Sequence, residues 1–219
     1  MIQTRKKVKT WLLSTCLILI SSFSVTQLSA AAPVKKLPSI DPFKPLLYDL
    51  LRRFPDEPKT KLIVVSASEQ KLFLIENLKV TQSYMISTAK AGLGNSDGSY
   101  KTPLGVHRIA EKIGDKAREG TIFQSRKNTK RIAKILKKPG KKSKADIITS
   151  RILWLSGMEP GINKDGKVDS HSRFIYIHGT DEEGRLGKPV SHGCIRMSNQ
   201  DVIELFDKVP VGTLVNIVE

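Results

Sequence analysis

The chain has 219 residues, of which 39% are hydrophobic, a composition that supports one well-packed domain and excludes global disorder. Its formal net charge of +16 is typical of nucleic-acid-binding proteins. A predicted export signal argues against a nucleic-acid partner and favours an anionic envelope polymer or membrane surface.

Residues 1–31 have the features of a secretory signal peptide. Basic residues precede the apolar run 11–25, and Ser29, Ala30 and Ala31 are small residues where a signal peptidase cleaves. We therefore predict cleavage after Ala31 and localisation in the periplasm. The alternative is an uncleaved inner-membrane anchor, although the apolar run is short beside the ~20 apolar residues of a spanning helix.

The two cysteines have different expected fates. Cys16 lies inside the predicted signal peptide, so Cys194 is the one cysteine of the exported chain. A lone thiol cannot form an internal disulfide, and outside the cytoplasm it is a liability unless it does chemistry or pairs with another chain. This favours Cys194 as a nucleophile.

The next two segments differ in their periodicity. Residues 32–60 are rich in proline and predict an arm with one short helix, in which Pro45 suits a first helical position. The segments 62–68, 71–77 and 80–88 are rich in β-branched and aromatic residues, which predicts an antiparallel meander.

The remaining pattern is also mainly β. Further strands are expected at 106–113, 152–156, 174–178 and 211–219. A late helix is expected from Gln200, with Ser198 or Asn199 as its N-cap and Pro210 at its end. We predict a mainly β catalytic domain over residues 61–219 with one late helix.

Residues 112–151 interrupt the strand pattern with fourteen Lys/Arg against three Asp/Glu, a net charge of +11. Within this insertion, 131–138 has helical spacing. The segment is either a solvated, mobile insertion or a basic lid or docking surface for an anionic envelope.

The nine residues 191–199, SHGCIRMSN, hold the expected chemistry. A thiol has a pKa near 8.5, so a neighbouring imidazole is needed to take its proton at neutral pH. His192 is close in sequence to Cys194, but His178 ends a different predicted strand and can approach the sulfur from across the site. We favour His178 as the base. The backbone N–H groups of Gly193 and Cys194 are candidate oxyanion donors.

Arg196 lies two residues beyond the thiol and can bind a substrate carboxylate, help the oxyanion, or form a structural salt bridge. His107 is expected to be a packed or edge histidine. Zinc held by the two site histidines and the cysteine is the disfavoured alternative, because the setting is basic and we expect no nearby Asp or Glu side chains to orient the ligands. We predict no metal and no cofactor.

The SHGC-x-R-x-x-N pattern with an upstream HG resembles the signature of the L,D-transpeptidase catalytic domain of bacterial peptidoglycan enzymes. The stretches 62–77 and 98–109 are similar to the opening hairpin of that family and its approach to the central strands. The resemblance covers residues 61–219. It implies a β-sandwich or barrel and no cofactor.

Residue by residue, the resemblance implies Cys194 as nucleophile and His178 as base, with His192 and Gly193 in the catalytic turn. Arg196 would contact the substrate or stabilise the intermediate. Ser191 and Asn199 would support the loop that carries Cys194, and Gly179 or Thr180 would lie near the base.

The implied reaction is acyl transfer on peptidoglycan stem peptides. The thiolate attacks the carbonyl of the third residue of a tetrapeptide stem, D-alanine leaves, and an amine resolves the thioester. With water as acceptor the enzyme is an L,D-carboxypeptidase. Carbapenems are expected to acylate Cys194. The alternatives are a cysteine peptidase, disfavoured because His precedes Cys here, and a non-catalytic wall-binding protein.

Overall fold

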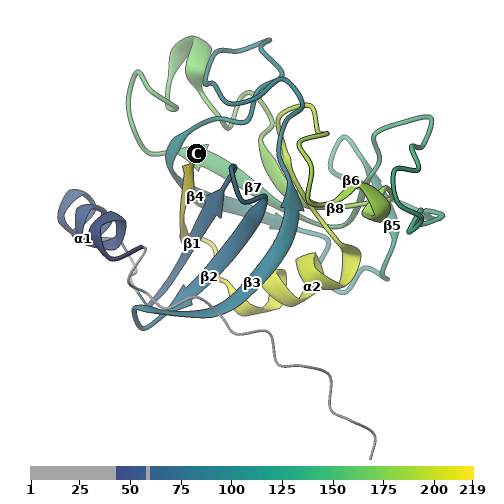
Figure 1. Cartoon of the computed structure of the whole chain (residues 1–219), viewed down its shortest axis with the longest axis horizontal. Helices are drawn as coiled ribbons and strands as arrows, with labels where there is room; N and C mark the ends of the chain where they lie inside the picture. Colours follow the sequence, from purple (N-terminus) through teal and green to yellow (C-terminus); the bar gives the residue numbers. More distant parts are fainter. Residues whose placement is uncertain (1–42, 58–59) are drawn as a thin grey trace, which may run out of the picture. The chain divides into compact units, whose positions relative to one another are not determined.

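The computed structural model describes residues 43–57 and 60–219 (Figure 1). The predicted signal peptide at 1–31 and most of the proline-rich arm before the first helix lie outside the described residues. Ten strands and two α-helices make up the described chain. They are α1 Lys44–Arg53, β1 Lys61–Ser66, β2 Lys71–Glu76, β3 Lys79–Ser87, β4 Gly105–Ile113, β5 Thr121–Gln124, β6 Lys127–Ile132, β7 Ile148–Gly157, β8 Tyr176–Thr180, β9 Ile195–Met197, α2 Asn199–Lys208 and β10 Leu214–Val218.

The ten strands form one sheet that closes on itself. The strand order is β4-β10-β1-β2-β3-β9-β8-β7-β5-β6, and β4 also pairs with β7. This extra pairing joins the two ends of an eight-stranded ring, and β5 and β6 extend beyond it. Pairing is parallel for β1–β10 and β8–β9 and antiparallel elsewhere. The prediction of a mainly β domain is confirmed. That prediction allowed either a sandwich or a barrel, and the closed sheet is a barrel.

The alternation of side chains along β1 explains how this sheet is buried on two faces. Ile63 and Val65 point into the main core, which also contains apolar residues of α2, while Leu62 and Val64 belong to a second cluster. Successive strand residues point to opposite faces. Residues of α1 cover the second cluster. The helix that the apolar spacing predicted in the arm is therefore confirmed, and its apolar face packs against the sheet.

Both helices begin as the sequence indicates. In α1 a proline occupies the first turn, and in α2 the Ser198 hydroxyl accepts from the N–H of Asp201 at 3.1 Å. This bond satisfies one of the free donors at a helix start. Neither helix in the described part of the chain is long and apolar enough to cross a membrane.

The basic segment 112–151 connects β4 and β7, two strands that pair with each other. Its first residues complete β4 and its last residues begin β7. Between them β5 and β6 form a hairpin, so the helix indicated by the spacing of 131–138 is wrong. The two turn residues, Ser125 and Arg126, both have positive φ, as a tight hairpin turn requires. Neither is the Asn or Gly that normally signals such a turn, so the hairpin could not be recognised from the sequence.

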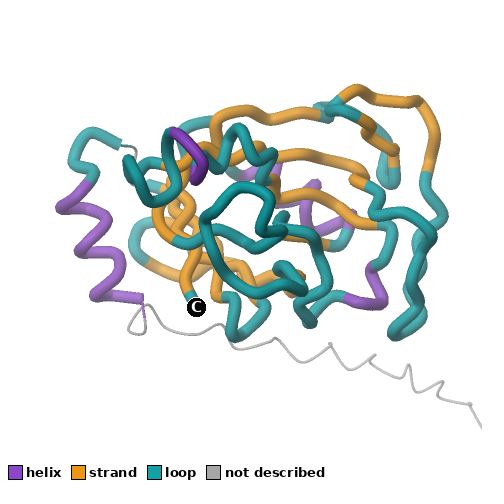
Figure 2. Tube along the Cα trace, turned by 90° about the horizontal axis from the view of Figure 1, so that it is seen from above, coloured by secondary structure: helices purple, strands orange, loops and turns teal. Residues whose placement is uncertain are grey.

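Three loops, drawn mostly teal in Figure 2, connect the strands around Cys194 and His178. They span 88–104, 158–175 and 181–194. Hydrogen bonds join them to one another: the Lys90 N–H donates to the Ser191 carbonyl at 3.0 Å, and the Arg173 guanidinium donates to the Lys101 carbonyl at 2.7 Å. Residues far apart in sequence are thereby fixed around β8 and β9.

Candidate active site

Cys194 immediately precedes β9 and faces a cluster of aromatic and aliphatic side chains. Its neighbours there include Trp154 and Tyr176. The side chain is half-buried, and the thiol donates to the carbonyl of Phe174 at 3.4 Å. The sulfur is thus held by packing and one weak hydrogen bond, with part of its surface open to an incoming group.

His178 lies on the adjacent strand β8, where it pairs in register with Arg196 of β9. The ring is 2% exposed, and Nδ1 lies 2.8 Å from the carbonyl oxygen of Gly179. A carbonyl can only accept, so Nδ1 carries the proton, and in the neutral ring Nε2 is unprotonated. The fold therefore fixes the tautomer that a base requires.

Burial governs the ionisation of both groups. Burial lowers the pKa of His178, against the opposing effect of the Asp146 charge. Although the Cys194 side chain is only partly covered, loss of water around the sulfur raises the pKa of the thiol to about 12. The Tyr176 N–H, Arg196 and Arg173 counteract this rise in the thiol pKa, and Asp146 adds to it. At neutral pH the resting site therefore holds a neutral thiol and a neutral imidazole.

The loop before Cys194 is held by its own serine. The Ser191 hydroxyl donates to the Cys194 carbonyl at 2.6 Å and accepts from the Gly193 N–H at 3.3 Å. Thr102, from a different loop, donates to the Gly193 carbonyl at 2.9 Å. Gly193 has φ 130, a backbone conformation that side chains disfavour. Because its N–H already has a partner, Gly193 must exchange that bond before it can receive an oxyanion.

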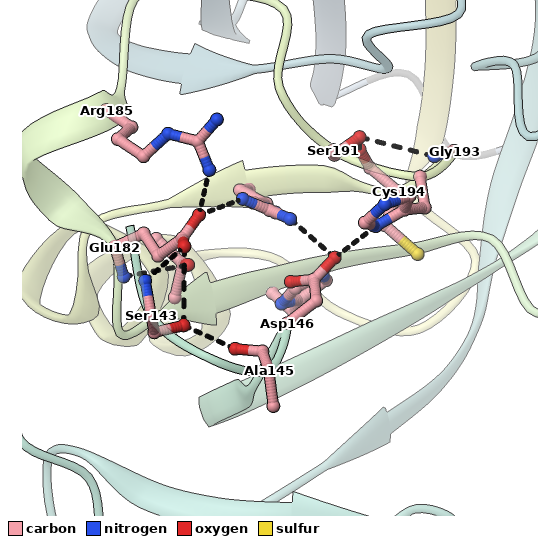
Figure 3. A network of polar contacts seen from close by, with 12 residues as sticks. Ser143, Ala145, Asp146, Glu182, Arg185, Ser191, Gly193 and Cys194 are labelled. Carbon is pink, nitrogen blue, oxygen red and sulfur yellow. Dashed lines mark hydrogen bonds and ion pairs between the residues drawn. The ribbon is translucent and has the colours of Figure 1, made fainter. Parts of the chain in front are cut away.

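His192 and Arg196 meet at a residue that the sequence reasoning missed. The Asp146 carboxylate accepts from His192 Nδ1 at 2.9 Å and from Arg196 at 2.5 Å (Figure 3). The His192 side chain is 67% exposed, so it lies at the rim of the site and does not bond the thiol. Burial would raise the pKa of Asp146, but His178, Arg196 and His192 together lower it.

Arg196 is part of a buried network of charges. Its side chain is 2% exposed, and besides Asp146 it bonds Glu182 at 2.9 Å. Glu182 also accepts from Arg185 at 2.5 Å and from the Ser143 N–H at 2.7 Å. These contacts favour the structural salt bridge among the alternatives considered for Arg196. They leave a direct substrate contact as a prediction.

Three further predicted residues are buried at the end of β8 and at the start of α2. Asn199 is fully buried, and its side chain accepts from the hydroxyls of Thr149 and Ser150, both at 2.6 Å, and donates to the Thr180 carbonyl at 2.9 Å. A Cβ on Gly179 would lie 2.7 Å from the Thr149 carbonyl, so only glycine fits there. Gly179, Thr180 and Asn199 are thus buried together in the segment that follows His178 and in the helix start that bonds it.

The structure places Cys194 directly before β9 and His178 on the adjacent strand β8, and it places His192 at the rim. Asp146, Glu182 and Thr102 are the polar residues of the site that the sequence did not reveal. Asp146 lies 46 residues from His192 within the basic segment, where a single acidic residue carries no signal. Within the described residues, no group of three or more His, Cys, Asp or Glu side chains is arranged to hold a metal ion.

Comparisons of the chain with known proteins all point to the same family. The family model described as YkuD, L,D-transpeptidase catalytic domain, matches residues 60–217. Probable L,D-transpeptidase YbiS of Escherichia coli K12 is 49% identical over 47 residues, which are 22% of this chain and 15% of that protein. Probable L,D-transpeptidase YcfS of the same strain is 25% identical over 187 residues, 83% of this chain and 52% of that protein.

The chain spans about half or less of the length of these curated relatives. Among solved structures, an L,D-transpeptidase from Mycobacterium smegmatis is similar with a TM-score of 0.46 and 17% identity. That similarity covers 73% of this chain and 59% of the other.

Proposed function

The chain belongs to the L,D-transpeptidase catalytic-domain family, and we propose that it transfers peptidoglycan stem peptides through a thioester on Cys194. The observation that supports the proposal is the placement of a half-buried thiol at the start of β9 and of a buried histidine, His178, on the neighbouring strand β8. The Nδ1–H···O contact of His178 at 2.8 Å leaves its Nε2 able to accept a proton.

The acylation step begins with two neutral groups. As Sγ attacks the carbonyl of the third residue of a tetrapeptide stem, the thiol proton moves to His178 Nε2. The resulting imidazolium then gives this proton to the departing amine of D-alanine, and a thioester remains on Cys194. Asp146 stabilises the transient positive charge of His178, because its carboxylate favours the protonated ring.

The second step reverses the roles. An amine from a second stem attacks the thioester, His178 removes its proton, and the thiol is restored with a new amide as product. Water in place of the amine gives a shortened stem, the carboxypeptidase alternative. The same residues serve both reactions, so the acceptor that reaches the thioester decides between them.

The substrate determines where the protein would act. Peptidoglycan stems are outside the cytoplasm, so we propose export by residues 1–31 and action in the periplasm. Carbapenems are proposed to acylate the same thiol. The basic segment 112–151 would add attraction to anionic envelope polymers.

Intact mass spectrometry tests the proposal. The protein is incubated with a disaccharide-tetrapeptide, with Cys194→Ala beside it. The expected result is a mass gain equal to the stem without D-alanine in the wild type only, together with released dimer or shortened stem. His178→Gln should slow formation of this adduct by about 10²–10⁴-fold, because the thiol loses its base.

Two results would contradict the proposal. The first is turnover that survives in Cys194→Ala. The second is a folded wild-type protein with a free thiol that gives neither adduct nor product with tetrapeptide and amine acceptors present, which would favour the non-catalytic wall-binding alternative.

A further inference from the structure

A basic cleft lies beside the loop that carries Cys194, and of its lining residues only Asp146 takes part in the steps above. It has a volume of about 220 Å³, and its lining combines three parts of the chain. Lys90 comes from the loop after β3, Lys142 and Lys144 from the basic segment, and Arg185 from the loop after β8. His192 and Arg196, on either side of Cys194 in the chain, also line it.

The charges of this cleft do not cancel. Its two carboxylates, Asp146 and Glu182, are bonded to Arg185, Arg196 and His192. The lysines at 90, 142 and 144 form no ion pair with the residues that the structure describes. Three ammonium groups around a small cavity make a site for a ligand with negative charge.

The backbone that carries these lysines is anchored to the site. The Ser143 N–H donates to Glu182 at 2.7 Å, and the Gly140 N–H donates to the Gly184 carbonyl at 3.0 Å. A Cβ on Gly184 would lie 2.2 Å from the Lys138 carbonyl, so glycine permits this close approach. On the other side the Lys90 N–H bonds the Ser191 carbonyl. The cleft is therefore built from fixed segments.

We propose that this cleft binds a carboxylate of the peptide that reacts at Cys194, held by Lys90, Lys142 and Lys144. The inference rests on the proposed function and adds a specificity site to it. A carboxylate suits the cleft because an ammonium donates charge-assisted hydrogen bonds to it. A stem peptide carries such carboxylates within a few bonds of its reacting carbonyl. Asp146, which lines the cleft, lies between Glu182 and Cys194 in the view of Figure 3.

Binding is measured first without turnover. Cys194→Ala protein is titrated by calorimetry with the tetrapeptide stem as free acid and as its carboxamide. We expect the acid to bind at least about tenfold more tightly than the amide, with a preference that weakens as salt is added. Adding Lys90→Gln, Lys142→Gln and Lys144→Gln together should remove this preference.

Lys141→Gln is the matched control, because Lys141 is an exposed neighbour in the same segment that does not line the cleft. It changes the net charge of that segment without changing the lining and should keep the preference for the acid. If the triple variant retains the preference, the proposal is wrong. Equal binding of acid and amide to Cys194→Ala protein overturns it as well.

Kinetics then identify which peptide uses the cleft. With Cys194 intact, donor and acceptor concentrations are varied separately, and we expect the triple variant to raise the KM of one of them with kcat little changed. An unchanged KM for both, with the thioester still forming, overturns the cleft and leaves the proposed function standing. A wild-type protein that never forms the thioester contradicts the proposed function, while the calorimetry still decides the cleft.

Discussion

The Cys194 thiol lies in surroundings that oppose its ionisation, because burial outweighs the nearby positive groups and raises its pKa to about 12. His178 is kept neutral by the same physical cause. A pair of this kind differs from a preformed thiolate–imidazolium pair. In the mechanism proposed above, the thiol proton moves when the carbonyl is attacked, which would couple substrate binding to proton transfer.

The pH dependence of thiol alkylation tests this description of Cys194. We expect the iodoacetamide rate constant to rise from pH 6 to pH 9 without a plateau, because the thiolate fraction keeps increasing below a raised pKa. The rate is measured from the mass of the alkylated protein, with Cys194→Ala as the blank. A plateau that begins near pH 6 would show a stable thiolate and contradict the prediction.

At the scale of elements, the start of α2 joins the helix to the strand that carries the base. Asn199 bonds β7 through Thr149 and Ser150 and bonds β8 through Thr180. Its neighbour Ser198 only caps the helix. The two adjacent residues at the start of α2 therefore have separable roles. Asn199 joins the helix to the strands of the site, and Ser198 caps the helix.

Paired substitutions test this separation. Asn199→Ala should lower the free energy of unfolding by about 2–4 kcal/mol, because buried hydroxyls and a carbonyl lose their partner. It should also lower kcat, because the end of β8 is freed. Ser198→Ala should cost about 1 kcal/mol and leave kcat nearly unchanged. Chemical denaturation and adduct formation give both quantities, and equal kcat losses in the two variants would contradict the assignment.

At the scale of the whole molecule, the ring closes where β4 pairs with β7, and a buried histidine lies at this closure. His107 on β4 is fully buried; its Nδ1 donates to the Gly105 carbonyl at 3.0 Å and its Nε2 accepts from the Ser170 hydroxyl at 2.9 Å. Burial lowers its pKa to about 4. The neutral ring thus joins the barrel to the loop that follows β7.

This histidine predicts an acid-sensitive fold. Since the folded-state pKa lies below the unfolded value of about 6.5, the unfolded chain binds protons first as pH falls. Stability from His107 is complete above pH 6.5 and is lost between pH 6.5 and 4, by at most about 3 kcal/mol.

Urea denaturation from pH 7.5 to 4 measures this loss. We expect His107→Gln to be less stable at pH 7.5 but to lose less of its stability on acidification than the wild type. His171→Gln, at a partly exposed ring, is the matched control and should follow the wild-type curve. The same acid loss in His107→Gln as in the wild type would remove His107 as the cause.

The sequence alone determined most of the local elements and the residues proposed to react. The β-branched and aromatic residues of 62–88 predicted three strands, and Ser198 or Asn199 predicted the start of α2. The SHGC pattern with the upstream HG singled out Cys194 and His178 as the candidates for the chemistry. These features depend on neighbours within a few residues, and such short-range patterns are written directly in the sequence.

Only the tertiary structure decided how the sheet closes, where 112–151 belongs and what surrounds Arg196. The β5–β6 hairpin turns at Ser125 and Arg126 without the usual glycine, so its turn gave no signal. Asp146 and Glu182 reach Arg196 across 50 and 14 residues. Such contacts depend on strand order and loop paths, and a charge that meets its partner through folding looks in sequence like any exposed residue.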